Sequence, residues 1–189
     1  MIRGILLAAG YGRRFDASGR QDKLLAPLPD GGAVLWHSAR ALCSALPVSL
    51  AVVRPGHRAR MDWLIEAGCE VLECPEAEFG MGSALAKAVQ ASASADGWVV
   101  ALADMPWLPS GVIRAVADAI DAPERVVAPV HAGRRGHPVG FGSGWRGRLA
   151  ALSGDEGARG LLSAGTIQLL ATDEPGVLRD VDRPADLGS

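Results

Sequence analysis

The residues after the first apolar run combine small side chains with two arginines. Residues 7–14 read LAAGYGRR, and Lys23 follows shortly afterwards. Small residues let main-chain N–H groups approach phosphate oxygens closely, and a nearby arginine and lysine neutralise a polyphosphate. The segment therefore predicts an anion-binding loop. A flexible basic surface turn is the alternative that the same residues allow.

This loop does not match either common phosphate-binding pattern. Phe15 stands where GxGxxG would have its third glycine, and no GxxxxGK[ST] occurs in the chain. These differences count against a dinucleotide-binding fold and against a Walker-type NTPase. We therefore expect a different way of holding phosphate.

Two acidic segments supply ligands that a hard divalent cation prefers. Asp104 follows the apolar run 98–102 in the sequence ALADMP, and Asp182 lies in DVDRPAD near the C-terminus. Ligands of open parallel sheets bind beyond the carboxyl ends of strands, which places Asp104 well for Mg²⁺. Alternation puts Asp180 and Asp182 on one side of an extended segment, before a short helix starting at Pro184. Capping or turn formation is the alternative role for Asp104 and Asp182.

Two other loops carry polar groups that do not define a chemistry by themselves. Gly80, Gly82 and Ser83 precede a helix and offer main-chain groups to a base or ribose, although Ser83 also fits a plain helix N-cap. His137 lies in GRRGHPVG, where a structural hydrogen bond beside a turn explains it equally well.

Apolar and amphipathic runs alternate along the chain, which predicts a layered α/β domain with a mainly parallel sheet. Strands are expected at 2–8, 48–53, 70–73, 98–102, 125–128, 138–142, 166–170 and 177–180. Helices are expected at 34–46, 58–67, 83–94, 110–120, 145–152 and 158–163. Gly68 is expected to end the second helix as its C′ residue, and Ser110 to cap the fourth.

Composition sets the class of protein. The 189 residues fit one domain over 1–189, and 49% hydrophobic with 21% charged residues is typical of a globular chain. A net charge of −2 argues against nucleic-acid binding by bulk electrostatics. No run approaches the roughly 18 apolar residues of a membrane helix, and the N-terminus does not resemble a signal peptide. A cytoplasmic protein without membrane contact is expected.

The three cysteines do not indicate a disulfide framework or a zinc site. Cys43, Cys69 and Cys74 are an odd number and lack CxxC spacing. We expect them to be small buried hydrophobic residues.

In their order, the motifs resemble those of the molybdenum cofactor cytidylyltransferases, within the MobA-like nucleotidyltransferases. They span residues 6–187 as LAAG with Arg14 and Lys23, then GMGSAL, ADMP, GRRGHPVGF, GDEGARGLL and DVDRPADL. The resemblance implies a single three-layer α/β/α domain with a mainly parallel, Rossmann-like sheet of the nucleotide-diphospho-sugar transferase type. It also implies a nucleoside triphosphate substrate, Mg²⁺ and a phosphorylated acceptor.

The resemblance also implies roles for individual residues. Arg14, Lys23 and Asp104 are expected to be catalytic. Asp104 and Asp182 are expected to hold Mg²⁺. The residues expected on the acceptor side are His137, Asp155 and Arg159. Those expected to bind the nucleotide are Leu7, Ala8, Ala9, Gly10, Gly12, Lys23, Gly80, Gly82, Ser83 and Asp104.

The expected reaction moves CMP from CTP to molybdopterin or its molybdenum form and releases pyrophosphate, with a molybdoenzyme as the expected partner. Ala9 favours CTP, because the guanylyltransferase branch more often has LAGG. A phosphate monoester has its second pKa near 6 and is mostly dianionic at neutral pH, so no side-chain base is obligatory. Charge neutralisation and alignment are then the main requirements.

Two alternatives stay open. One is a related nucleotidyltransferase that acts on a sugar phosphate or another small phosphate, and the other is a molybdenum cofactor chaperone without catalysis. The presence of Asp104 and Asp182 argues against a loss of chemistry. The segment between Arg14 and Lys23 is longer than the family pattern, and Cys74 stands where an asparagine is common.

Overall fold

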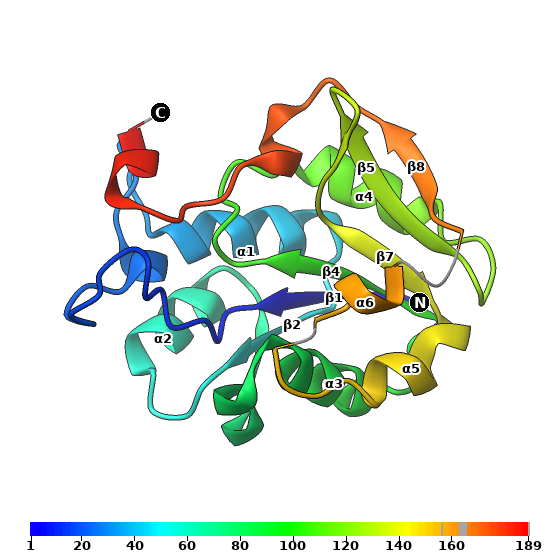
Figure 1. Cartoon of the computed structure of the whole chain (residues 1–189), viewed down its shortest axis with the longest axis horizontal. Helices are drawn as coiled ribbons and strands as arrows, with labels where there is room; N and C mark the ends of the chain where they lie inside the picture. Colours follow the sequence, from blue (N-terminus) through cyan, green and yellow to red (C-terminus); the bar gives the residue numbers. More distant parts are fainter. Residues whose placement is uncertain (156, 163–165, 189) are drawn as a thin grey trace.

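A computed structural model describes residues 1–155, 157–162 and 166–188. A mixed, mainly parallel sheet forms the centre, with strand order β3-β2-β1-β4-β7-β5-β6 and β8 paired with β5 (Figure 1). The strands are β1 (Ile2–Leu7), β2 (Ser49–Val53), β3 (Glu70–Glu73), β4 (Gly97–Leu102), β5 (Val126–His131), β6 (Arg134–Arg135), β7 (Val139–Gly142) and β8 (Gln168–Ala171). The helices are α1 (Val34–Ala45), α2 (Arg58–Glu66), α3 (Met81–Ala91), α4 (Ser110–Asp118), α5 (Arg146–Ala150) and α6 (Arg159–Leu162).

Helices cover both faces of the sheet, because successive side chains of a strand point to opposite faces. In β1, Leu6 and the following Ala8 pack in a core shared with α1, α2 and α4. Ile5 and Leu7 pack in a second core shared with α3 and α5. From Gly4 to Leu7 the strand is apolar and buried because neither face meets solvent there, and the fold is a Rossmann-like, three-layer α/β domain.

Strands β1, β2, β3 and β4 are parallel, so their carboxyl ends lie at one edge of the sheet. β7 then runs antiparallel to β4, and β5 antiparallel to β7. The C-terminal segment returns to that edge, where the main-chain N–H of Val181 donates to the carbonyl of Asp104 at 2.8 Å. In Figure 1 this segment, in red, lies beside the blue loop that follows β1.

Most predicted elements are confirmed, and Gly68 ends α2 with φ of +100° as expected of a C′ glycine. Ser110 is not the cap of α4, because Pro109 occupies the N-cap position and no side chain caps that end. The hairpin strand β6 was not predicted, since two exposed arginines carry no strand pattern. The predicted helix at 145–152 is shorter, and Ser163 of the helix predicted at 158–163 lies outside the described residues.

The predicted strand at 177–180 is wrong. A 3-10 helix, η4 (Pro175–Leu178), stands there instead, with its proline in the first turn. Gly176 lies against the main chain of Trp107, where an added Cβ would meet the Trp107 carbonyl oxygen at 2.0 Å. The carbonyl of Val177 accepts from the His137 N–H at 2.9 Å. These contacts come from distant parts of the chain and fix a turn that alternation alone does not reveal.

Cys69 and Cys74 are buried, Cys43 is half-buried, and all three are free thiols. The described ranges contain no helix that has both the length and the apolar character needed to cross a membrane.

Candidate functional site

A cleft of about 630 Å³ opens at the carboxyl ends of β1 and β4. It lies between the loop after β1, the start of α3 and the C-terminal segment. Most residues predicted for the site border it, namely Leu7, Ala9, Gly10, Gly12, Arg14, Lys23, Gly80, Asp104, Asp155, Arg159 and Asp182.

The loop after β1 presents main-chain amides to this cleft. Gly12 has φ of +63°, a left-handed conformation that glycine adopts readily. Its Cα lies against the stem of Lys23, since an added Cβ would meet Lys23 Cγ at 3.2 Å. No described residue accepts a hydrogen bond from the N–H groups of Ala9, Gly10 or Tyr11. Such unpaired amide donors beside a cation form an anion-binding arrangement.

Lys23 begins the short 3-10 helix η1 (Lys23–Leu25) and points at the C-terminal segment. Its Nζ donates to Asp104 Oδ2 at 2.7 Å and to the Val181 carbonyl at 2.9 Å, and lies 3.6 Å from Asp182 Oδ1. The side chain is only 11% exposed, so this ammonium is screened weakly by water. Lys23 thus joins the two predicted metal ligands, which lie far apart in the sequence.

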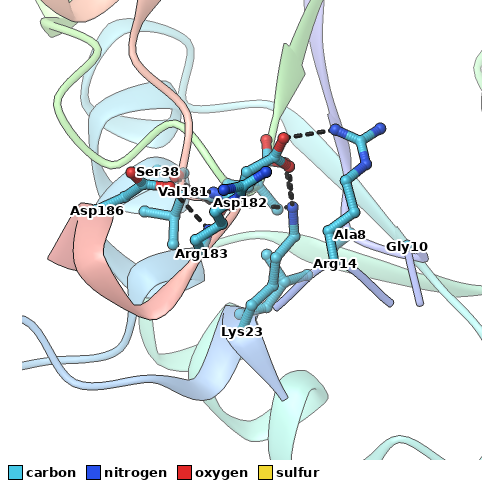
Figure 2. Close-up of polar contacts among 12 residues, drawn as sticks. Ala8, Gly10, Arg14, Lys23, Ser38, Val181, Asp182, Arg183 and Asp186 are labelled. Atoms are coloured by element: carbon cyan, nitrogen blue, oxygen red, sulfur yellow. Dashed lines mark hydrogen bonds and ion pairs between the residues drawn. The ribbon is translucent and has the colours of Figure 1, made fainter. Parts of the chain in front are cut away.

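Arg14 reaches the same point from solvent. Its guanidinium pairs with Asp182 Oδ2, and Figure 2 shows the Arg14 and Lys23 side chains converging on the Asp182 carboxylate. The Arg14 side chain is largely exposed, which leaves it free to follow a ligand. The loop, Lys23 and Arg14 together make one wall of the cleft cationic.

The long segment between Arg14 and Lys23 is closed by one carboxylate. Asp16 Oδ1 accepts from the N–H and hydroxyl of Ser18, and Oδ2 accepts from the N–H of Gln21 at 2.8 Å. These hydrogen bonds lower the pKa of Asp16. The extra residues therefore form a self-contained turn, and Lys23 still reaches the cleft.

Three carboxylates meet in the cleft beside Lys23 and Arg14. Asp104, Asp180 and Asp182 each place one oxygen within 4.8 Å of the others. Partial burial, helped by the charges of Asp104 and Asp182, raises the pKa of Asp180. Asp104 Oδ1 is buried and accepts no hydrogen bond from any described residue. Asp180 was not among the predicted ligands, although its position two residues before Asp182 was the available signal.

The loop at the start of α3 borders the cleft through Gly80 and is hydrogen-bonded to the segment around Gly154. Gly82 N–H donates to the Gly154 carbonyl at 2.9 Å, and Gly154 N–H donates to Ser83 Oγ at 3.1 Å. Gly80 has φ of +127°, and an added Cβ would lie 2.4 Å from Asp155 Oδ1. Only glycine fits there. Ser83 is not the N-cap of α3, because Gly80 occupies that position.

His137 lies beneath the cleft rather than on its surface. The residue is half-buried, and its Nδ1 atom is buried without a hydrogen-bond partner among the described residues. Burial lowers its pKa; Asp104 opposes this shift, while Arg159 and Arg135 add to it. A lowered pKa keeps the ring neutral at pH 7. The charges of Asp104 and Arg159 both influence this pKa.

Four predicted residues, Ala8, Gly82, Ser83 and His137, do not border the cleft. Other residues do border it without having been predicted, among them Tyr11, Glu78 and Asp180. Tyr11 stacks on Arg54, with the guanidinium carbon 3.6 Å from the ring centroid. No pattern in the sequence pointed to that stack, since Arg54 follows a different strand.

Comparison with known families now decides the family. The MobA-like NTP transferase domain matches residues 4–171, which include the phosphate loop, Lys23 and Asp104. The chain belongs to the MobA-like NTP transferase family. It is also 32% identical to the purine catabolism protein PucB of Bacillus subtilis (strain 168), over 97% of this chain and 92% of that protein.

Solved structures of similar proteins share the fold of this MobA-like domain. Rv0371c from Mycobacterium tuberculosis H37Rv is 28% identical with a TM-score of 0.83, over 98% of this chain and 94% of that one. A structure of Rv0371c in complex with manganese aligns at 24% identity and a TM-score of 0.74, over 100% and 93% of the two chains. A nucleotidyl transferase from Methanothermobacter thermautotroptrophicus has 23% identity and a TM-score of 0.81, over 98% and 94%.

Proposed function

We propose that this nucleotidyltransferase-type domain moves CMP from CTP to molybdopterin or its molybdenum form and releases pyrophosphate. The observation that carries the proposal is the meeting of Lys23 with Asp104 and Asp182 beside the free amides of the phosphate loop. Family membership supports nucleotidyl transfer. The cofactor as acceptor rests on the motif resemblance and fits a relative named for purine catabolism.

In this proposal the triphosphate lies along the cationic wall. The amides of Ala9, Gly10 and Tyr11 bind phosphate oxygens, and Lys23 and Arg14 neutralise charge that builds up on the departing pyrophosphate. An acceptor phosphate oxygen bonds to the α-phosphorus as the bond to the bridging oxygen breaks. Because the acceptor is already dianionic, the chain needs to align these groups rather than to remove a proton.

The carboxylates opposite this wall fit a divalent cation. Oxygens of Asp104, Asp180 and Asp182 are close enough to share one ion, and Asp104 Oδ1 has no other partner among the described residues. Hard oxygen donors of this kind are typical ligands of Mg²⁺, and manganese accompanies the related Rv0371c. Bound there, Mg²⁺ would supply charge neutralisation and polarisation of the α-phosphate.

The acceptor side is assigned to His137, Asp155 and Arg159. Asp155 and Arg159 border the cleft, and Arg159 offers a charge that suits a phosphate. His137 is half-buried and its pKa is lowered, so it supports the site's shape and not a net charge. A molybdoenzyme that receives the product is the proposed partner.

The choice of base is proposed to depend on Ala9 and the wall opposite it. Ala9 borders the cleft, and its methyl group sets how closely a base approaches the loop. Glu78, Gly80 and Ala84 line the same cleft from η2 (Pro75–Phe79) and α3. We expect CTP to be preferred over GTP.

The acceptor is tested by CTP-dependent pyrophosphate release with Mg²⁺ and a panel of acceptors. Turnover with molybdopterin or molybdenum cofactor is expected. Turnover with sugar phosphates alone would identify a sugar-phosphate nucleotidyltransferase instead. Tight cofactor binding without pyrophosphate release would identify a carrier that lacks catalysis.

The nucleotide is tested separately by thermal shift with CTP, GTP, ATP and UTP in the presence of Mg²⁺. A ligand that binds only the native state raises the apparent melting temperature. CTP is expected to give the largest shift, and selective stabilisation by GTP would overturn the assignment of cytidine. The Asp104→Ala variant, with the same nucleotides, shows whether the shift needs the proposed metal site.

A further inference from the structure

Arg60 is a buried charged residue on the surface helix α2. Its side chain is 2% exposed, whereas that of Arg58, two positions earlier on the same helix, is 85% exposed. Arg58 pairs with Asp62 on the outside of the helix. Burial of an arginine costs free energy unless its donors are satisfied, so the partners of Arg60 indicate its role.

The side-chain hydrogen bonds that Arg60 makes to described residues all lead to the loop after β1 or to Asp22, the residue before Lys23. Nη1 donates to the Ala8 carbonyl at 2.7 Å, and Nη2 to the Gly10 carbonyl at 3.0 Å. Nε and Nη2 donate to the two oxygens of Asp22 at 2.6 and 2.8 Å. One planar guanidinium therefore joins the loop after β1 to Asp22. A lysine ammonium lacks the forked donors needed to bind both at once.

These contacts orient the loop amides. In a trans peptide, the C=O of one residue and the N–H of the next point in opposite directions. With the carbonyls of Ala8 and Gly10 held by Arg60, the N–H groups of Ala9 and Tyr11 point away from that guanidinium. Arg54 Nε holds the Ala9 carbonyl in turn at 2.9 Å. Three consecutive carbonyls are thus occupied, and the amides that follow them are left for a ligand.

The same guanidinium also reaches Lys23 through Asp22. Asp22 Oδ1 accepts from the N–H of Leu24 at 3.0 Å and so caps the turn that begins at Lys23. Lys23 packs under Gly12 of the loop and extends to Asp104. A shift of Arg60 would therefore move the loop amides and the lysine ammonium together.

We propose that Arg60 is a positioning residue that fixes the loop amides and Lys23 as one phosphate-binding unit. This inference rests on the proposed function, because it takes the ligand of that unit to be the polyphosphate of a nucleoside triphosphate. Arg60 acts through the Ala8 and Gly10 carbonyls and through Asp22, without touching the ligand.

The test compares Arg60→Lys with Arg58→Lys, a matched replacement on the same helix. Arg60→Lys keeps the charge but cannot bind both carbonyls and the carboxylate together. Binding of inorganic triphosphate with Mg²⁺, measured by calorimetry, is expected to weaken about ten-fold or more in Arg60→Lys, as for lost supporting contacts elsewhere. Arg58→Lys is expected to bind like the wild type. All proteins are first shown to be folded at the working temperature by circular dichroism.

A second measurement separates positioning from stability. Amide hydrogen exchange is expected to accelerate in Arg60→Lys over residues 8–12 and 22–25, with the exchange of β4 unchanged. Asp22→Asn serves as the second variant if Arg60→Lys does not fold, and it is expected to weaken triphosphate binding as well. Equal binding by wild type, Arg60→Lys and Asp22→Asn would overturn the inference and leave the proposed function standing. Failure of the wild type to bind triphosphate would overturn both.

Discussion

The two walls of the cleft are built in opposite ways. On the wall of β1 and α2, the buried charge of Arg60 is matched by Asp22 and by loop carbonyls. On the wall of the C-terminal segment, Asp104 Oδ1 and His137 Nδ1 are buried without a partner among the described residues. Three carboxylates also share a small space there.

This difference indicates which wall has its buried polar groups satisfied before a ligand binds. A satisfied network is rigid and stabilises the fold, so the first wall presents phosphate donors in a fixed geometry. Buried groups without partners and adjacent like charges cost free energy, which binding of the proposed cation and acceptor would recover. Changes in the first wall should therefore reduce both stability and phosphate binding, whereas changes in the second should mainly alter activity, metal response and pH response.

The largest effect is expected for Asp104→Ala. Loss of the proposed metal ligand is expected to remove several kcal/mol of charge stabilisation, so transfer should fall by roughly a thousand-fold while the fold persists. Pyrophosphate release measures the rate of transfer, and circular dichroism shows whether the fold persists. Asp62→Ala, which removes an exposed carboxylate on α2, is the control. Turnover like that of the wild type in Asp104→Ala would remove Asp104 from the mechanism.

Asp22→Asn is expected to give the largest loss of stability. Removing one partner of a buried ion pair leaves Arg60 partly uncompensated, at a cost of about 3 kcal/mol in the free energy of unfolding. Asp62→Asn, which breaks only the exposed pair with Arg58, should cost less than about 0.5 kcal/mol. Urea unfolding measures both. Similar losses in the two variants would mean that the first wall is no more rigid than the surface.

Lys23→Met should affect the two walls in opposite directions. Triphosphate binding should weaken roughly ten-fold or more, because a charge-assisted contact to phosphate is lost. Without nucleotide, Mn²⁺ should bind more tightly, because the ammonium no longer competes for Asp104 and Asp182. Calorimetry with each ligand alone measures the two effects. Weaker Mn²⁺ binding would show that Lys23 supports the carboxylates rather than competing for them.

His137 gives the second wall a sensitivity to acid. Its folded-state pKa lies below the unfolded value, so its contribution to stability is present above about pH 6.5 and is lost as the pH falls toward the folded pKa. His137→Asn, which does not titrate, should therefore lose less stability than the wild type between pH 7.5 and 5. Urea unfolding at both pH values provides the comparison. Parallel losses would exclude His137 as a source of acid sensitivity.

The smallest effect is expected for Asp180→Asn in metal-free protein. Its carboxylate is exposed, but its pKa is raised by partial burial and by Asp104 and Asp182, so ionisation of Asp180 costs more free energy in the folded than in the unfolded chain. Stability therefore falls as the pH rises through this pKa, and Asp180→Asn should recover a few tenths of a kcal/mol, the size expected for an exposed group. Stabilisation by added Mn²⁺ should decrease. A loss of stability with chelator present would contradict the proposed repulsion.

The sequence predicted the charged residues that meet in the cleft better than the residues that hold them in place. Lys23, Asp104 and Asp182 were all predicted, and the structure brings their side chains together. Arg60 and Arg54 were not predicted, because an arginine on an amphipathic helix or after a strand gives no sign of burial against a loop. Ser83 carried a signal for helix capping, but its hydroxyl binds Gly154, 71 positions away.

By itself the sequence determined the alternation of strands and helices and the edge at which the chemistry lies. Hydrophobic periodicity is local, and parallel strands place their carboxyl ends at one edge, so the loop after β1 and Asp104 after β4 were expected at the same edge. The pairing of β1 with β4, which makes the two segments neighbours, was decided by the tertiary structure. Only the tertiary structure decided that Arg60 holds the loop, that Asp180 joins the other carboxylates and that residues 175–178 turn instead of extending. These features depend on contacts between segments distant in the chain, such as Lys23 with Val181 across 158 positions, and no local pattern records them.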